Sequence, residues 1–383
     1  MPAVLFTHGF PPDVGGIQTY MYARCLGTPG EIAVVAPDRP GAAAFDREQP
    51  FPVWRWATPP GLARPAQIIG PLIGGRKMAR QIEVEWVEAG TVLPSGFAAY
   101  RLAKRLGRPY LVWTHGQELF RAQHLPWNLL GGTGKLMRFL LVNARAVMAN
   151  SHATADLVEG LGVPRSSIHV LRPGLLPGNE DAEAAEGPGL RERFGLGERP
   201  LVVSVGRLVP RKGHDLLLQA VALARRESPD LACAIVGEGP QGAELEREIE
   251  ALGLNGHAFL PGRLTEGALA EAYATATLFA LLPRHDLTRG WWEGFGIVFK
   301  EAGSYGLPVV GTRAGGIPDA VEHERTGLLV EPGDTAAAAA AILQLVRNPE
   351  LARRLGEGGR EHAHDQPEWQ TIRTVMTARH SED

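Results

Sequence analysis

Residues 284–301 read RHDLTRGWWEGFGIVFKE, a stretch that places two carboxylates around a glycine turn leading into a predicted helix. Glu293 ends a polar loop, Gly294-Phe295-Gly296 form the turn, and Glu301 follows on the first turns of the helix. Glycine lets the backbone approach a ligand closely, and the free amides at a helix N-terminus attract anions. Carboxylates do not neutralise phosphate, but they accept hydrogen bonds from sugar hydroxyls. The stretch therefore predicts a site for a sugar attached to phosphate.

The same two glutamates have a simpler interpretation. Glu293 would then be an N-terminal capping carboxylate, and Glu301 a solvated residue on the helix surface. Taken alone, the spacing favours this structural interpretation. The functional interpretation depends on partners elsewhere in the chain.

Short apolar runs alternate with helical segments along the chain, an alternation typical of parallel strands in a doubly wound α/β sheet. The predicted strands lie at 3–7, 31–36, 53–56, 83–87, 110–114, 146–149, 201–205, 232–236, 258–260, 277–281, 308–311 and 327–330. A chain of 383 residues is too long for one typical core. We therefore predict two domains built on doubly wound sheets, 1–177 and 178–365, with a linker at 178–189. A C-terminal helix at about 366–383 is expected to cross back onto the first domain.

Two segments of the first domain are less regular. Residues 62–80 are expected to be only partly helical, because two prolines and three glycines interrupt the pattern. Residues 120–142 mix basic and large apolar side chains. They are interpreted either as an ordinary helix packed on the sheet, which we prefer narrowly, or as a surface that meets a membrane or an apolar acceptor.

Composition narrows the class of protein. Apolar residues make up 44% of the chain and charged residues 21%, with a net charge of −3, so bulk charge does not indicate a nucleic-acid partner. Cys25 and Cys233 are far apart and lack metal-site spacing, which fits a reducing cytoplasm. The N-terminus is interpreted as a strand and not as a signal peptide. The apolar run 336–346 is shorter than the roughly 20 residues that span a bilayer.

A basic pair follows the predicted strand at 201–205. Arg207 and Lys212 stand five residues apart on a strand-to-helix loop, where arginine can grip phosphate through two nitrogens and lysine adds a mobile point charge. A solvated basic loop is the plainer alternative. The loop has neither the Gly-Lys-Ser/Thr ending of a P-loop nor a Gly-x-Gly-x-x-Gly pattern. A nicotinamide enzyme is therefore poorly supported.

Other candidate ligand contacts stand at the ends of predicted strands, where binding loops gather in open α/β sheets. They are Gly15 and Gly16 at the start of a helix, Gly206, Gly237, Arg263 and His115. Each signal is weak singly, because glycine after a strand is frequent and a lone histidine there is usually structural. Their common position at strand ends is the informative feature.

The motifs together resemble the retaining glycosyltransferases of family four. The marks are FPPDVGGIQ at 10–18, THG at 114–116, GRLVPRKG at 206–213, VGEG at 236–239 and EGFGIVFKEA at 293–302, the Glu-x7-Glu motif. The resemblance implies the GT-B fold, with two Rossmann-like domains facing across a cleft. Within the family, the chain looks most similar to bacterial phosphatidylinositol mannosyltransferases that use GDP-mannose.

The resemblance also implies roles for individual residues. It assigns catalysis to Arg207, Lys212, Glu293 and His115, with the two cations holding the donor diphosphate and stabilising it as it leaves. Its donor-binding residues are Gly15, Gly16, Gly206, Gly237, Arg263, Gly294, Phe295, Gly296, Ile297 and Glu301. No metal and no cofactor are expected, because arginine and lysine supply the positive charge.

The expected reaction moves a sugar from a nucleotide-sugar donor to a hydroxyl acceptor. GDP-mannose is the first candidate donor, and UDP-glucose or UDP-N-acetylglucosamine the second. Retaining glycosidases hold two carboxyls about 5 Å apart, whereas eight helical residues rise about 12 Å. We therefore expect no covalent intermediate on Glu293 or Glu301. A sugar phosphorylase or epimerase, and a non-catalytic nucleotide-sugar binding protein, are the weaker alternatives.

The acceptor is the more open question. A lipid-linked or polyol hydroxyl is the candidate, which would bring a cytoplasmic protein into peripheral contact with the inner face of the cell membrane. Trp291-Trp292 and the stretch VEAG at 87–90 depart from the family pattern on the expected acceptor side. The oligomeric state is left open.

Overall fold

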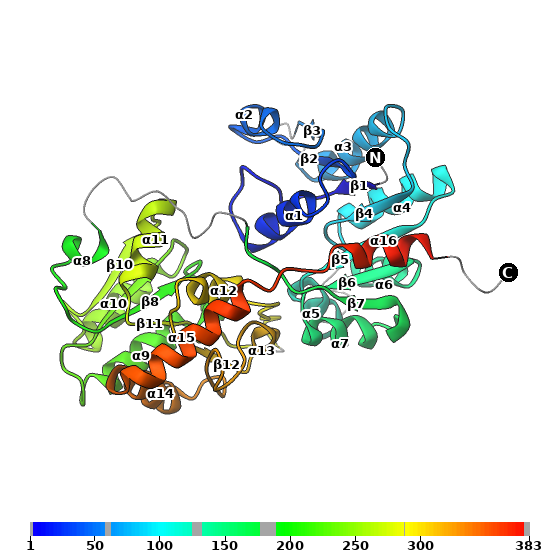
Figure 1. Ribbon diagram of the computed structural model, residues 1–383. Coiled ribbons are helices and arrows are strands. Elements are labelled where there is room, and N and C mark those ends of the chain that lie inside the picture. Colours follow the sequence, from blue (N-terminus) through cyan, green and yellow to red (C-terminus); the bar gives the residue numbers. More distant parts are fainter. Residues whose placement is uncertain (1–2, 58–62, 125–131, 177–188, 287, 379–383) are drawn as a thin grey trace. The chain divides into compact units, whose positions relative to one another are not determined.

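The chain forms two compact units, each built on its own parallel sheet (Figure 1). The computed structural model describes residues 3–57, 63–124, 132–176, 189–286 and 288–378. Unit 1 comprises Met1–Pro173 with Pro367–Asp383, and unit 2 comprises Gly174–Gln366. The predicted linker at 178–189 lies, apart from Gly189, outside the described residues, as does the part 125–131 of the mixed basic and apolar segment.

Unit 1 is organised around a seven-stranded sheet in the order β3-β2-β1-β4-β5-β6-β7. The strands are β1 (Ala3–Phe6), β2 (Ile32–Pro37), β3 (Val53–Trp56), β4 (Trp86–Ala89), β5 (Tyr110–Thr114), β6 (Ala146–Ala149) and β7 (Ile168–Val170). The pairings are parallel, and Ala3 lies opposite Ile32 on one side and Trp86 on the other. Most of their side chains are buried, as expected where helices cover both faces of a sheet.

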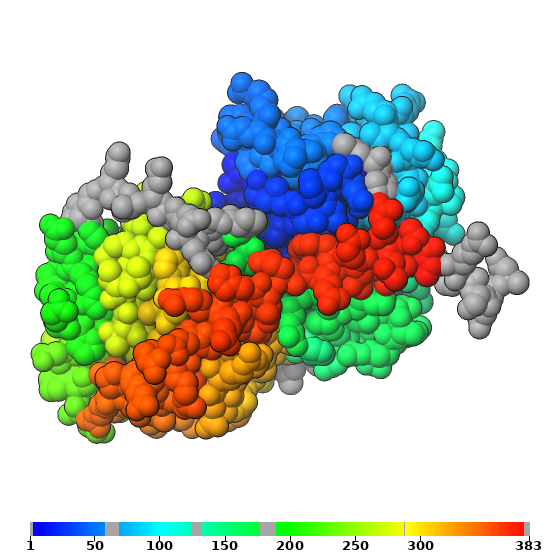
Figure 2. All heavy atoms as spheres, viewed as in Figure 1, coloured from blue at the N-terminus to red at the C-terminus, as the bar shows by residue number. Residues whose placement is uncertain are grey.

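The helices of unit 1 include one from the end of the chain. They are α1 (Gly16–Leu26), α2 (Ala42–Arg47), α3 (Ala63–Met78), α4 (Ser95–Leu106), α5 (Gln117–His124), α6 (Thr133–Val142), α7 (His152–Gly160), the 3-10 turn η1 (Arg165–Ser167) and α16 (Gln370–Thr377). Ile372 and Met376 of α16 are buried in the same core cluster as residues of β1 and β5. Figure 2 shows this segment lying on the surface of unit 1. Unit 1 therefore needs both ends of the chain to complete its core.

Helix α3 is continuous, so the expectation of a broken helix at 62–80 was wrong. Pro71 lies inside it. Its glycines are packing positions: a side-chain carbon added at Gly70 would lie 2.5 Å from Trp56, and one at Gly74 2.2 Å from Trp54. Glycine lets this helix lie closely on the sheet, which offsets its poor helix propensity.

Unit 2 has a six-stranded parallel sheet in the order β10-β9-β8-β11-β12-β13. The strands are β8 (Leu201–Val205), β9 (Ala232–Val236), β10 (Ala258–Gly262), β11 (Leu278–Ala280), β12 (Val309–Thr312) and β13 (Gly327–Val330). Alternate residues of β8 enter two different clusters, with Val202 in one and Leu201 and Val203 in the other. The alternation places an apolar core on each face of the sheet.

The elements connecting these strands are mostly helical. They are α8 (Leu190–Arg193), the 3-10 turn η2 (Pro210–Lys212), α9 (His214–Ala224), α10 (Gly242–Ala251), α11 (Glu266–Thr275), α12 (Ile297–Ser304), α13 (Ile317–Ala320), α14 (Thr335–Arg347) and α15 (Pro349–Ala363). The predicted class of two doubly wound, Rossmann-like sheets is confirmed. In detail, β4 begins three residues later than expected, and the short helix α2 was not predicted. Among the described residues, no helix combines the length and apolarity needed to span a membrane.

Candidate active site

The basic loop of unit 2 runs from the end of β8 through η2 into α9. Backbone hydrogen bonds from neighbouring segments hold it: the Leu208 amide donates to the Glu238 carbonyl at 2.9 Å, the Gln241 amide donates to the Leu208 carbonyl at 3.1 Å, and the Arg284 amide donates to the Arg211 carbonyl at 3.0 Å. Arg207 is exposed at the start of the loop, whereas the Lys212 side chain is only 12% exposed. The loop therefore presents one accessible cation and one enclosed cation.

Lys212 and Arg211 converge on one carboxylate oxygen. Lys212 Nζ lies 2.8 Å from Glu293 Oε2, and Arg211 Nη1 donates a hydrogen bond to the same oxygen at 2.6 Å. Burial alone would raise the pKa of Glu293, but the charges of Lys212 and Arg211 outweigh it and hold that pKa below its usual value. Glu293 is therefore ionised at neutral pH. The N-cap of α12 is Gly296 and no side chain caps the helix, so the interpretation of Glu293 as a capping carboxylate is wrong.

The turn after Glu293 is fixed by a neighbouring loop. The Gly316 amide donates to the Glu293 carbonyl at 2.9 Å. Gly296 adopts a φ of 87° as the residue that caps α12, a conformation that favours glycine. Helix α12 begins only at Ile297, so the 12 Å helical rise assumed between Glu293 and Glu301 does not apply. The amides of Ile297 and the turn before it form the helix N-terminus.

Glu301 lies on α12 beside Tyr273 of α11. Tyr273 Oη donates to Glu301 Oε2 at 3.4 Å. Burial raises the pKa of Glu301, and the Tyr273 hydrogen bond and the Lys212 charge offset this only in part. Burial together with Glu301 raises the pKa of the Tyr273 phenol well above its usual value. Lys212 thus acts electrostatically on both carboxylates of the motif.

The glycine strand ends of unit 2 lie next to one another. The Gly206 amide donates to the Val236 carbonyl at 3.0 Å, and the Gly237 amide donates to the Gly262 carbonyl at 2.9 Å. A side-chain carbon at Gly237 would lie 2.0 Å from the Gly206 carbonyl oxygen. Arg263 follows Gly262 and is exposed. Gly206, Gly237 and Arg263 therefore share one edge of the sheet, as predicted from strand order.

Gly213 gives a direct test of how tightly this loop is built. Its φ is 69°, and an added side-chain carbon would lie 1.9 Å from the Leu282 carbonyl oxygen. We expect Gly213→Ala to lower the free energy of unfolding by about 1–3 kcal/mol and to displace Lys212. Gly256→Ala is the matched control, because its φ is 73° and nothing lies within 4 Å. Denaturant unfolding of both variants measures the difference; equal losses would show that the contact with Leu282 does not matter.

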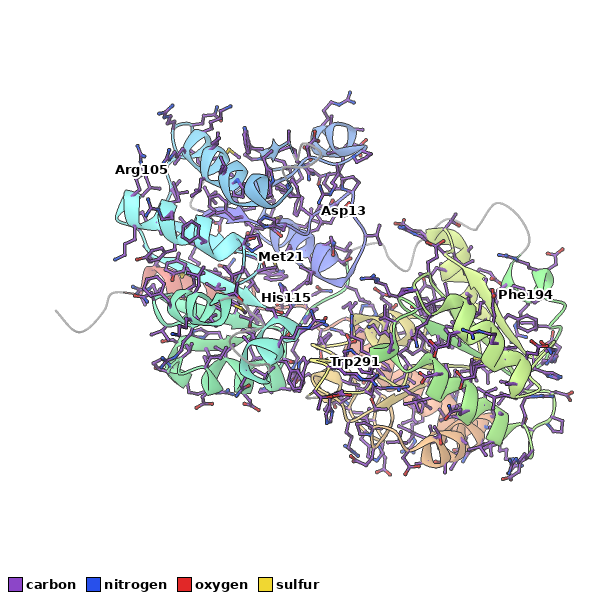
Figure 3. All side chains as sticks on the ribbon, turned by 180° about the vertical axis from the view of Figure 1, so that it is seen from behind. Asp13, Met21, Arg105, His115, Phe194 and Trp291 are labelled. Atoms are coloured by element: carbon purple, nitrogen blue, oxygen red, sulfur yellow. The ribbon has the colours of Figure 1, made fainter. Side chains whose placement is uncertain are left out.

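The predicted residues of unit 1 lie after the loop that follows β1 and at the end of β5. Gly15 caps α1, and Gly16 is its first residue. His115 follows β5 and is 7% exposed (Figure 3). Its Nε2 is 2.7 Å from the Gly90 carbonyl oxygen, and its amide donates to Glu118 Oε1 at 2.8 Å. The ring is thereby held in one orientation.

The Trp291-Trp292 stretch departs from the family pattern. It belongs to a loop of unit 2 that is held by contacts between its own residues. Asp286 and Trp291 form an antiparallel backbone bridge, with hydrogen bonds of 3.1 and 3.0 Å. The Arg289 guanidinium lies 4.7 Å from the centre of the Trp291 ring, and Figure 3 labels this tryptophan. The loop leads directly into Glu293.

Sequence reasoning assigned no role to two residues of the basic loop. Arg211 contacts Glu293, as described above. His214 is buried at the start of α9, and its Nε2 lies 3.3 Å from the Arg207 carbonyl oxygen. Burial, with a further contribution from the Lys212 charge, lowers the pKa of His214 to about 4, so it is neutral at pH 7. The available signal was their position in sequence, next to Lys212 for Arg211 and two residues after it for His214.

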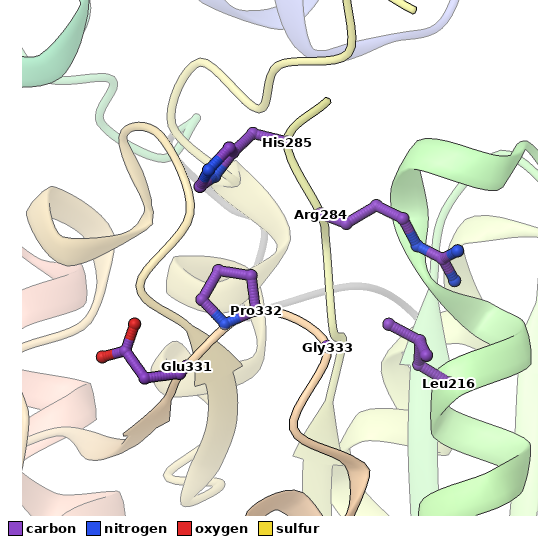
Figure 4. Close-up of a pocket in the computed structure, with 6 residues that line it drawn as sticks. All are labelled: Leu216, Arg284, His285, Glu331, Pro332 and Gly333. Carbon is purple, nitrogen blue, oxygen red and sulfur yellow. The ribbon is translucent and has the colours of Figure 1, made fainter. Parts of the chain in front are cut away.

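A pocket of about 410 Å³ opens elsewhere in unit 2. Its lining residues are Leu216, Arg284, His285, Glu331, Pro332 and Gly333 (Figure 4). The predicted site residues are not among them. Arg284 is engaged with Asp215 at 2.5 Å, so the guanidinium is already neutralised. Among the described residues, no group of three or more His, Cys, Asp or Glu side chains could hold a metal; metal independence stays a prediction.

Family models of glycosyltransferases match both units of the chain. Residues 14–175 match the model described as Glycosyltransferase Family 4, and residues 190–362 match that of Glycosyl transferases group 1. A solved structure of Anabaena HepE in complex with UDP has a TM-score of 0.76 at 21% identity, with 98% of each chain covered. Sucrose-phosphate synthase from Thermosynechococcus elongatus has a TM-score of 0.76 at 22% identity, with 98% of this chain and 97% of that chain covered.

Sequence relatives cover almost the whole chain. A GDP-mannose-dependent alpha-(1-6)-phosphatidylinositol monomannoside mannosyltransferase of Mycolicibacterium smegmatis is 34% identical over 96% of this chain and 95% of its own. A monoacylated-substrate counterpart from Corynebacterium glutamicum is 27% identical over 98% of this chain and 96% of its own. Because fold, motifs and near-complete relatives agree, this chain belongs to the GT-B glycosyltransferases of family 4 and is a glycosyltransferase enzyme.

Proposed function

We propose that this glycosyltransferase moves mannose from GDP-mannose to a hydroxyl of a lipid-linked acceptor of the phosphatidylinositol-mannoside type, with retention at the anomeric carbon. The observation that carries the donor assignment is the match to GDP-mannose-dependent mannosyltransferases over 96% of the chain at 34% identity. The enclosed Lys212, held 2.8 Å from Glu293, supports a site in which a cation meets a diphosphate.

In the proposed reaction, the bond between the anomeric carbon and the diphosphate oxygen breaks as the acceptor oxygen bonds to that carbon on the same face. The acceptor proton passes to a phosphate oxygen of the leaving GDP. Negative charge grows on the diphosphate, so Arg207 and Lys212 lower the barrier if they are already in place. Glu293 would contact the sugar, and Glu301 the ribose hydroxyls. The turn amides from Gly294 onward would meet the phosphate.

The unit 1 groups complete the proposed assignment. Gly15 and Gly16 would allow close approach to the diphosphate, because Gly16 opens α1 and leaves its amides available. His115 would hydrogen-bond the sugar from a ring that Gly90 orients.

A basic and apolar face of unit 1 supports the lipid-linked acceptor. Ile69 and Ile73 of α3 are 54% and 46% exposed, and Phe139 and Val142 of α6 are each 44% exposed. Helix α4 contacts both α3 and α6, and the ring centres of Tyr100 and Phe139 lie 5.2 Å apart. The exposed basic residues on these helices and the turns that follow them are Arg76, Lys77, Arg80, Arg101, Lys104, Arg105, Arg108, Lys135 and Arg138. Such a combination suits an anionic membrane surface.

The test is a donor panel read by nucleotide release and by mass of the glycosylated lipid. GDP-mannose, UDP-glucose and UDP-N-acetylglucosamine are each offered with phosphatidylinositol mannoside in anionic vesicles. We expect turnover with GDP-mannose and a product heavier by one hexose. Turnover with a UDP-sugar alone would transfer the proposal to that donor. Tight nucleotide binding with no transfer from any donor would instead favour a non-catalytic binding protein.

A further inference from the structure

Two positively charged side chains contact one carboxylate oxygen of Glu293. Lys212 Nζ lies 2.8 Å from Oε2, and Arg211 Nη1 lies 2.6 Å from the same atom. The side chains of Arg211, Lys212 and Glu293 are 23%, 12% and 11% exposed, so solvent screens this group only partly. Glu293 thus has two counter-ions, so it keeps one of them if the other moves to another anion.

Both cations belong to η2: the Arg211 carbonyl accepts from the Arg284 amide at 3.0 Å, and the Lys212 amide donates to the Val209 carbonyl at 3.0 Å. Arg284 is itself held by Asp215 at 2.5 Å. The two cations differ in their side chains. The Arg211 guanidinium is planar and directional, whereas the Lys212 ammonium is a point charge on a flexible stem. Lys212 is the cation that can change partners.

We propose that Arg211 is a positioning residue of the transfer reaction: it retains the Glu293 carboxylate in place when Lys212 exchanges that carboxylate for the donor diphosphate. This inference rests on the function proposed above. Without Arg211, Lys212 would have to serve both anions, and Glu293 would compete with the diphosphate for the same ammonium. With Arg211 present, the carboxylate keeps a counter-ion after the exchange.

The other charged groups near this cluster do not replace Arg211. Glu301 on α12 is a second carboxylate that Lys212 influences, so it adds to the demand for positive charge. His214 on α9 is neutral at pH 7 because its pKa is lowered to about 4. Arg207 stands exposed on the same loop and is assigned to the diphosphate.

Arg211→Gln is expected to lower kcat by about 10- to 100-fold, because a displaced group near the reacting atoms costs that much. The acid limb of the pH profile should move to higher pH. Arg211 holds the pKa of Glu293 down, so its removal raises that pKa, and the carboxylate is lost at a higher pH as the medium is acidified. Arg211→Lys should restore the acid limb more fully than it restores kcat.

Arg325→Gln is the matched control in the same unit. Arg325 Nη1 also lies 2.6 Å from a glutamate, Glu322, but its side chain is 56% exposed. We expect its kcat and pH profile to equal those of the wild type. The comparison separates the loss of any arginine–glutamate pair from the loss of the pair at Glu293.

A second measurement does not depend on turnover. Carbon-13 NMR of glutamate side-chain carboxyls, with Glu293→Gln for assignment, follows the titration of Glu293 in the full chain. A higher midpoint in Arg211→Gln supports the inference, whereas an unchanged midpoint overturns it even if no donor is ever turned over. If the wild type is active, wild-type kcat in Arg211→Gln also overturns it. Inertness of the wild type toward every donor counts against the proposed function instead.

Discussion

Lys212→Ala is expected to lower kcat by about 10²–10³-fold, the usual consequence of removing one preorganised group that stabilises developing negative charge. Lys212 ends η2, and its ammonium is enclosed beside Glu293. The charge on the departing diphosphate is greater in the transition state than in the bound donor, so the loss should fall on kcat at least as much as on donor affinity. Steady-state kinetics and calorimetric donor binding measure the two effects.

Two variants sharpen this test. Lys212→Arg keeps the charge but changes its shape, and we expect a partial recovery of kcat. Arg353→Ala removes an exposed cation of α15, whose side chain is 66% exposed and paired with Glu357, and should leave kcat unchanged. Undiminished turnover in Lys212→Ala would remove the leaving-group role on which the proposed mechanism depends.

The alternation of strands and helices was predictable because each strand is a short apolar run in a sheet buried on both faces. The strand-end positions of Gly206, Gly237 and Arg263 followed from the same pattern. Helix α3 was not predictable, because the glycines that suggested breaks are the points where Trp54 and Trp56 approach the helix. Such a contact joins distant segments, and no local pattern reveals it.

The candidate site was predictable to a similar depth. Sequence motifs indicated Lys212 and Glu293, but not that Arg211 shares the carboxylate, because adjacency in sequence does not reveal that both side chains reach the same oxygen. Departures from the family pattern were a weaker guide to the acceptor side than the motifs were to the donor site. Glu88, in the divergent stretch at 87–90, was expected on the acceptor side, yet its side chain is fully buried. It pairs there with Arg24 of α1, far away in sequence.

Glu88→Ala should destabilise unit 1 by about 3–5 kcal/mol, because it leaves a buried guanidinium without its counter-ion. Arg24 contacts both carboxylate oxygens, with Nη2 2.6 Å from Oε1 and Nε 3.2 Å from Oε2. The indole nitrogens of Trp86 and Trp113 each donate to the same carboxylate at 3.0 Å. The substitution therefore orphans three buried donor groups at once, each costly to leave unpaired. Denaturant unfolding followed by tryptophan fluorescence reports it.

A comparison with an exposed ion pair of the same N–O distance decides whether burial is the cause of the expected loss of stability in Glu88→Ala. Arg373 Nη2 lies 2.6 Å from Glu31 Oε1 in the same unit, but these side chains are 43% and 36% exposed. Glu31→Ala should cost no more than about 1 kcal/mol, since solvent screens the pair. The double variant Arg24→Met with Glu88→Leu should lose less stability than Glu88→Ala, because it removes both buried charges and not just one. If Glu88→Ala costs no more than Glu31→Ala, the buried carboxylate is not what holds α1 to β4, and packing around Trp86 and Trp113 must suffice.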